Sequence, residues 1–128
     1  MVFYTLAVYA YMGYRRYKAV YRREVPLAFY KTYNGEEPEA LRVLSRHVIN
    51  LLEAPLLFYV VSLVAFTTGN TGSAVVLLAW AYVGLRLVHG FIHLGSNIVA
   101  WRFRVFVLSM MVLTLYLALV AFGLFGAR

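Results

Sequence analysis

Apolar residues along the chain gather into four long stretches, and most polar residues lie between them. The stretches predict helices over about 1–21, 39–67, 74–95 and 103–122. A helix needs roughly 20 mainly apolar residues to cross a bilayer. The last three stretches meet that length, whereas the first is apolar only to Tyr14 and continues to Tyr21 as an amphipathic, aromatic-rich segment. The pattern predicts an all-α integral membrane four-helix bundle, with residues 1–128 as a single domain.

The segments between these stretches carry signals for loops and breaks. Residues 25–39 contain two prolines and an Asn-Gly pair, which predict a loop before the second helix. Within that helix Pro55 predicts a kink, because proline removes one backbone hydrogen bond. Residues 68–73 form an uncharged turn, so the second and third helices are expected to be antiparallel neighbours.

The composition narrows the class of protein. Hydrophobic residues make up 63% of the chain and charged residues 13%, and the mean hydropathy of +0.75 lies far outside the range of soluble domains. The chain has no cysteine, so disulfides and cysteine-ligated metals are excluded, and any thiol chemistry must use a thiol from another molecule. The lipid bilayer is the expected surrounding, and no nucleic-acid partner is expected.

The formal net charge of +7 is concentrated at one end of the predicted helices. The turn at 68–73 has no charge, whereas the link between the third and fourth helices is basic. The link between the first and second helices, with the residues beside it, holds most of the remaining basic residues: Arg15, Arg16, Lys18, Arg22, Arg23, Lys31, Arg42 and Arg46. By the positive-inside rule, these two links lie on the cytoplasmic side, and both termini and the uncharged turn lie on the other.

Polar residues also recur along one face of two predicted helices. On the second helix they are spaced four, four and three apart, at Arg42, Arg46, Asn50 and Glu53. On the third they are spaced three, four and four apart, at Arg86, His89, His93 and Asn97. Such spacings place side chains on one side of a helix. Ionisable residues in membrane spans usually face a bundle interior or a polar cavity, so these faces predict an intramembrane site.

Some of these residues also have purely structural interpretations. Counted from the uncharged turn at 1.5 Å per residue, Glu53 and Arg86 lie about 25 Å and about 21 Å along their helices, so they are expected to be near each other. They could form an ion pair that fixes the register of the helices. The spacing of His89 and His93 could ligate a metal or haem, but a third ligand is not evident and no metal is expected. His47 is expected to point away from the Arg46 face.

Aromatic residues near the ends of the predicted spans have a simpler interpretation. Trp80, Tyr82 and Trp101 are expected to be anchors at the membrane–water interface, where their rings combine an apolar body with a polar group.

Two motifs resemble those of the MAPEG family, the membrane-associated proteins in eicosanoid and glutathione metabolism. The run from Arg46 through Asn50 to Glu53 looks like that family's Arg-x-x-x-Asn-x-x-Glu signature on the second helix. The run Arg86-x-x-His89-x-x-x-His93 resembles its Arg-x-x-His-x-x-x-Tyr segment. The resemblance covers nearly the whole chain and is closest to an uncharacterised bacterial branch, which implies a bacterial cytoplasmic membrane.

The resemblance implies a homotrimer that binds glutathione in clefts between neighbouring subunits, at the cytoplasmic end of the bundle. Arginines would bind the two carboxylates of glutathione and Glu53 its ammonium group. Asn50 would hydrogen-bond the peptide part. The residues implied in glutathione binding are Arg42, Arg46, Asn50, Glu53, Arg86, His89 and His93.

The resemblance implies that catalysis depends on an arginine at the start of the fourth helix. This arginine would favour the thiolate form of glutathione. The two residues at that place are Arg102, which is preferred, and Arg104. The catalytic branches have tyrosine where this chain has His93. The expected function is a glutathione S-transferase or glutathione-dependent peroxidase acting on lipophilic substrates. The alternatives are a non-catalytic protein that binds a small anion or other membrane proteins, and a histidine-ligated redox protein.

Overall fold

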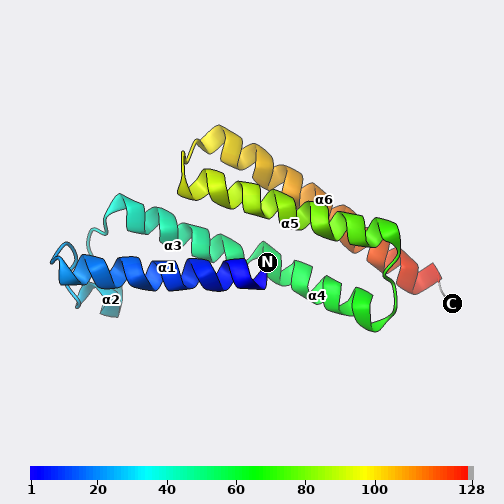
Figure 1. Ribbon diagram of the computed structural model, residues 1–128, viewed down its shortest axis with the longest axis horizontal. Helices are drawn as coiled ribbons and strands as arrows, with labels where there is room; N and C mark the ends of the chain where they lie inside the picture. Colours follow the sequence, from blue (N-terminus) through cyan, green and yellow to red (C-terminus); the bar gives the residue numbers. More distant parts are fainter. Residues whose placement is uncertain (127–128) are drawn as a thin grey trace. The chain divides into compact units, whose positions relative to one another are not determined.

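The computed structural model describes residues 1–126 and shows an all-α protein, as predicted (Figure 1). Residues 127 and 128 of the expected domain lie outside the described residues. The contacts divide the chain into two compact units, Met1–Leu51 and Leu52–Arg128. The helices are α1 (Val2–Tyr21), α2 (Phe29–Thr32), α3 (Glu39–Leu52), α4 (Ala54–Thr67), α5 (Ser73–Leu94) and α6 (Val99–Gly126).

The observed helices differ from the predicted ones at three places. The predicted helix over 39–67 is interrupted at Glu53, and Pro55 lies in the first turn of α4, where its missing N–H has no helical acceptor to lose. The predicted loop over 25–39 contains the single turn α2. The last helix begins at Val99 rather than near 103, so Arg102, which would have preceded the predicted helix, lies in its first turn.

Three segments are long and apolar enough to cross a membrane: Glu39–Thr67, Ser73–Leu94 and Val99–Phe125. Helix α1 is not among them, because Arg15, Arg16 and Lys18 lie in its second half. Three of the four expected spans therefore meet the requirement for a span. The crossing of the bilayer by α1 stays a prediction.

In the first unit, the apolar side of α1 packs against α3. Val8 on α1 is buried with Leu44, Val48 and Leu51 on α3. A second buried cluster explains why the link contains α2: Phe29 is buried together with three other residues, Ala19, Val25 and Leu41. Burial of the Phe29 ring stabilises the turn α2. The prolines and glycine of the link had predicted a loop there instead.

In the second unit, α5 and α6 lie side by side, and α4 also contacts α6 (Figure 1). An aromatic group links the three helices: the Phe58 ring centroid lies 4.8 Å from that of Tyr82 and 5.7 Å from that of Tyr116. The Tyr116 hydroxyl also donates a hydrogen bond to Ser62 Oγ, at 3.1 Å. The turn between α4 and α5 is tied to α6 by Asn70, whose amide donates to the Val120 carbonyl at 3.1 Å.

Candidate functional site

One face of α5 is buried and polar over the second half of the helix. Tyr82, Arg86, His89 and His93 are spaced four, three and four residues apart and are each at most 3% exposed. This spacing places them on one stripe of the helix. The sequence predicted that Arg86, His89, His93 and Asn97 share a face, and the structure buries the first three on α5. The prediction was wrong for Asn97, which lies beyond the end of α5 at Leu94 and has a non-helical backbone. A buried guanidinium and two imidazoles in a membrane span form an arrangement suited to an anionic or polar ligand.

Helix α6 supplies an aromatic side chain to this stripe. The Phe106 ring centroid lies 5.8 Å from Arg86 Cζ, which is a cation–π distance, and 5.8 Å from the His89 ring. The His89 and His93 rings meet edge to face, with centroids 5.6 Å apart. Phe106 was missed by the sequence analysis, because a lone phenylalanine in an apolar helix gives no signal that it packs on a cation.

The prediction that Tyr82 is an interface anchor was wrong. Its side chain is fully buried, against Phe58 of α4. Trp80 and Trp101 are 70% and 55% exposed, as side chains at the bilayer surface would be. The signal that could have separated Tyr82 from these two is its position four residues before Arg86, on the same face of α5.

The link between α5 and α6 positions one of the two arginines proposed for thiolate stabilisation. Asn97 adopts a left-handed backbone conformation, with φ of 49°, which asparagine tolerates better than most residues. Its side-chain oxygen accepts a hydrogen bond from Arg102 Nη1 at 2.6 Å. Arg102 is half-buried, whereas Arg104 is exposed and lies over the Trp101 ring, with Cζ 5.0 Å from the centroid. The two arginines thus occupy different surroundings.

The polar residues predicted on the second helix lie on the exposed side of α3. Arg42 and Arg46 are exposed, and the half-buried Asn50 donates a hydrogen bond from Nδ2 to the Arg46 carbonyl at 3.0 Å. His47 is buried and shares a 2.9 Å hydrogen bond with the Tyr4 hydroxyl of α1. The prediction that His47 points away from the Arg46 face is therefore confirmed.

Glu53 occupies the interruption between α3 and α4, and its side chain is exposed. Arg86 is 1% exposed, and among the described residues the predicted ion pair between Glu53 and Arg86 is not formed. The depth of Glu53 along the helix is not what prevents the pair, because the residues between the turn and Glu53 form the single helix α4. The pair is absent because Glu53 lies at the interruption with a non-helical backbone, where its side chain is exposed rather than buried beside Arg86. The carboxylate of Glu53 is consequently accessible for another cationic partner.

The structure thus groups the predicted residues into three sets. Arg86, His89 and His93 form a buried stripe on α5, Arg102 and Asn97 form a pair at the α5–α6 link, and Arg42, Arg46 and Asn50 lie along α3.

Comparison with known families gives a match to the MAPEG family over residues 1–122. Searches among curated proteins and among solved structures give no match.

Proposed function

Because this chain belongs to the MAPEG family, a family of membrane glutathione-related enzymes with a four-helix membrane fold, we propose that it binds glutathione and transfers it to lipophilic electrophiles or uses it to reduce lipophilic peroxides. The observation that carries the proposal is the buried arginine of α5: Arg86 is 1% exposed within a membrane span. Such an arginine is costly unless a specific environment or ligand requires it.

The residue types of the candidate site match the chemical groups of glutathione. Glutathione has two carboxylates and an ammonium group. Arg46 and Arg86 would bind the carboxylates through charge-assisted hydrogen bonds, with Arg42 adding positive charge. Asn50 would bind a peptide group, and the exposed carboxylate of Glu53 would bind the ammonium. His89 and His93 would add hydrogen-bonding groups beside Arg86.

Glutathione would supply the thiol that this cysteine-free chain lacks. An adjacent guanidinium favours the ionised thiol by direct charge attraction. Two features favour Arg102 for this role over Arg104: it is half-buried, and Asn97 orients it through the 2.6 Å hydrogen bond. In a transfer reaction, the thiol sulfur would form a bond to the electrophilic carbon, and the leaving group would depart with its bonding electrons.

The assembly and location also come from the family resemblance. We propose a homotrimer in a bacterial cytoplasmic membrane, with glutathione bound between neighbouring subunits near the two basic links. On this arrangement, the residues of α3 and those of α5 and α6 at one site can belong to different chains. Lipophilic substrates would enter from the bilayer, which already concentrates them.

The test is calorimetric titration of the detergent-purified protein with glutathione. Wild type is expected to bind in the micromolar-to-millimolar range, and Arg46→Ala and Arg86→Ala are each expected to abolish binding. Lys31→Ala is the matched control, because it removes an exposed positive charge outside the proposed site. No binding by well-folded wild type would overturn the proposal.

Catalysis requires a second assay, with glutathione and 1-chloro-2,4-dinitrobenzene, in which chloride is released. Arg102→Ala is expected to lose turnover and Arg104→Ala to keep most of it. If both variants turn over as wild type does, the assignment of the thiolate-stabilising arginine is wrong.

A second candidate is a binding protein without catalytic activity, and it is favoured by one residue. His93 occupies the position at which the catalytic branches of the MAPEG family have tyrosine. His93→Tyr separates the two candidates: a gain of turnover over an inactive wild type that binds glutathione would identify the wild-type chain as a binding protein.

A further inference from the structure

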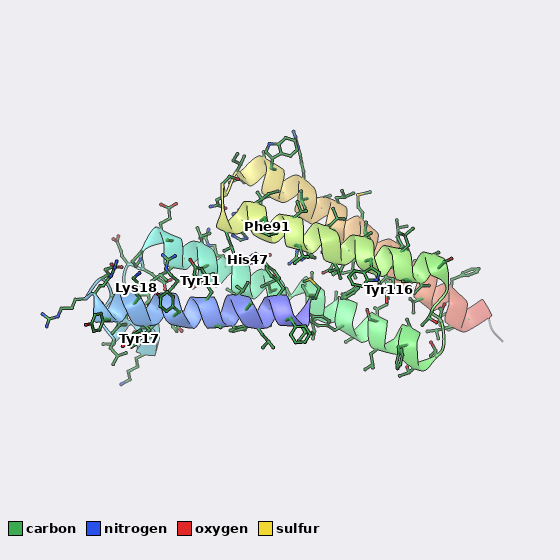
Figure 2. All side chains as sticks on the ribbon, in the orientation of Figure 1. Tyr11, Tyr17, Lys18, His47, Phe91 and Tyr116 are labelled. Atoms are coloured by element: carbon green, nitrogen blue, oxygen red, sulfur yellow. The ribbon has the colours of Figure 1, made fainter. Side chains whose placement is uncertain are left out.

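A cavity of about 350 Å³ lies within the first unit, between the second half of α1 and the residues that begin α3. It involves none of the residues proposed to bind glutathione. Figure 2 shows two of its lining residues, Tyr11 and Lys18, on α1. The side chains that form its polar wall are Tyr11, Tyr14, Arg15, Lys18, Arg22 and Glu24.

The charge on this wall is positive. Three cations line the cavity and one carboxylate opposes them. That carboxylate, Glu24, lies 3.9 Å from Arg22 in a solvent-exposed ion pair. The charges of Arg15 and Lys18 are therefore left to act on whatever occupies the cavity.

Tyrosine rings hold these two cations in place. Arg15 Nη1 donates a 2.7 Å hydrogen bond to the Tyr11 hydroxyl, and Lys18 Nζ lies 5.8 Å from the centroid of the Tyr14 ring. Each pair is one helical turn apart on α1, so the cations and rings share a face. This arrangement reduces the side-chain freedom that a ligand would otherwise have to remove on binding.

Apolar atoms form the remaining surface. Ala19 and Leu41, which also line the cavity, are each 3% exposed and belong to the buried cluster beneath it. A site with cationic walls next to an apolar base suits an amphiphile, in which a phosphate group adjoins a hydrocarbon chain.

We propose that this cavity binds the phosphate group of an anionic phospholipid of the cytoplasmic leaflet. Arginine and lysine are suited to phosphate oxygens. The cavity lies where the apolar half of α1 gives way to its basic half, and tyrosines are typical of the interfacial level of a bilayer. Basic clusters beside membrane spans commonly recognise anionic lipids, and each nearby Lys or Arg adds to the attraction. The proposal is independent of glutathione binding.

The test is native mass spectrometry of the full-length protein in detergent, titrated with phosphatidylglycerol or, separately, with phosphatidylcholine of the same chain length. Wild type is expected to retain phosphatidylglycerol in preference to phosphatidylcholine. The double variant Arg15→Gln/Lys18→Gln is expected to lose that preference by about tenfold or more, since two phosphate-directed charges are removed.

The matched control is Arg23→Gln/Lys31→Gln, which removes two positive charges from the basic segment that follows α1 but changes no lining residue. It is expected to keep the preference. An equal loss in both double variants would overturn the proposal, because general surface charge would then explain the binding. Lys18→Gln alone, with a smaller expected loss, replaces the double variant if that variant does not fold.

Inorganic phosphate and glutathione distinguish other occupants. Binding of inorganic phosphate without any preference between the two lipids would overturn the lipid assignment in favour of a free phosphate ligand. Displacement of phosphatidylglycerol by glutathione in wild type and in Arg46→Ala alike would assign the cavity to the peptide. Wild type that keeps its lipid in the presence of glutathione supports the proposal, whether or not glutathione binds elsewhere.

Discussion

Two arginines, one in each unit, show how differently the chain treats a positive charge. Arg16 of α1 is half-buried and has several contacts: it donates to Ser45 Oγ at 3.1 Å, and its Cζ lies 5.2 Å and 5.6 Å from the centroids of Tyr30 and Tyr33. Arg86 of α5 is 1% exposed, within a membrane span and against Phe106.

The difference reflects the solvent available to each charge. Near the membrane surface, a guanidinium keeps part of its hydration and gains only modestly from each aromatic ring or hydroxyl. In a span, the alternative to protein contacts is hydrocarbon, so a charge is placed where the surroundings are fixed. The stability of the first unit is therefore expected to tolerate changes to its cations, whereas that of the second unit is expected to depend on its buried polar stripe.

The most direct way to break this comparison is to remove each arginine in turn. Arg86→Ala is expected to destabilise the protein by about 3 kcal/mol or more, because it leaves a cavity and deprives buried polar groups of their surroundings. Arg16→Ala is expected to cost about 1 kcal/mol, as is usual for partly solvated contacts. Denaturant titration in detergent, followed by circular dichroism, measures both.

Arg86→Lys is the control for charge alone. It keeps the positive charge but loses the planar guanidinium that stacks on Phe106, so an intermediate loss is expected. Equal destabilisation by Arg16→Ala and Arg86→Ala would show that the two units do not differ in this way.

Two glycines sharpen the comparison at the level of packing. A Cβ at Gly123 of α6 would overlap the side-chain amide of Asn70, whereas a Cβ at Gly13 of α1 meets open space. Gly123→Ala is expected to destabilise the protein by about 1–3 kcal/mol, as overpacking does. Gly13→Ala is expected to stabilise it by about 0.5–1 kcal/mol, since alanine has less backbone freedom to lose. Unfolding midpoints test both predictions. Destabilisation by Gly13→Ala would show that Gly13 of α1 is packed against a neighbour and does not face open space.

Substitution of two tyrosines compares how much a single hydrogen bond stabilises each unit. Tyr116→Phe removes the bond to Ser62, and Tyr4→Phe removes the bond to His47. Each is expected to cost about 1 kcal/mol. Tyr116→Phe is expected to cost the more, because Tyr116 is 2% exposed and its ring lies in the aromatic group with Phe58. The same titration compares them, with Tyr21→Phe, an exposed site, as the control.

The sequence predicted the stripe on α5 because a helical face depends only on residue spacing. Arg86, His89 and His93 were grouped in this way, and their burial followed from their charge or polarity within an apolar segment. What lies opposite them depends on contacts between helices that are distant in the sequence. Neither the packing of Phe106 on Arg86 nor that of Phe58 on Tyr82 could be inferred from spacing.

The wrong predictions have local physical causes. The start of α6 was placed too late because Arg102 was assigned to the polar link, although arginine is a good helix former. The Glu53–Arg86 pair was expected because the two residues lie at comparable depth along neighbouring helices, and depth does not say which way a side chain points. In the structure the interruption falls at Glu53 itself, which removes this carboxylate from the regular face of α3.

The smallest expected effect concerns Tyr30, in the basic link of the first unit, where neighbouring groups shift the pKa of the phenol. Burial and the nearby Glu37 carboxylate raise the pKa of Tyr30, and the Arg16 guanidinium opposes them. The folded protein therefore disfavours the phenolate, so stability should fall as the pH rises through the ordinary tyrosine pKa of about 10. Between about pH 9 and about pH 11, the unfolding midpoint of Tyr30→Phe should fall less than that of wild type. Glu37→Gln should lie between them, because it removes only one of the two causes. An alkaline loss in Tyr30→Phe equal to that of wild type would mean that this phenol, despite its position beside Arg16, does not couple ionisation to folding.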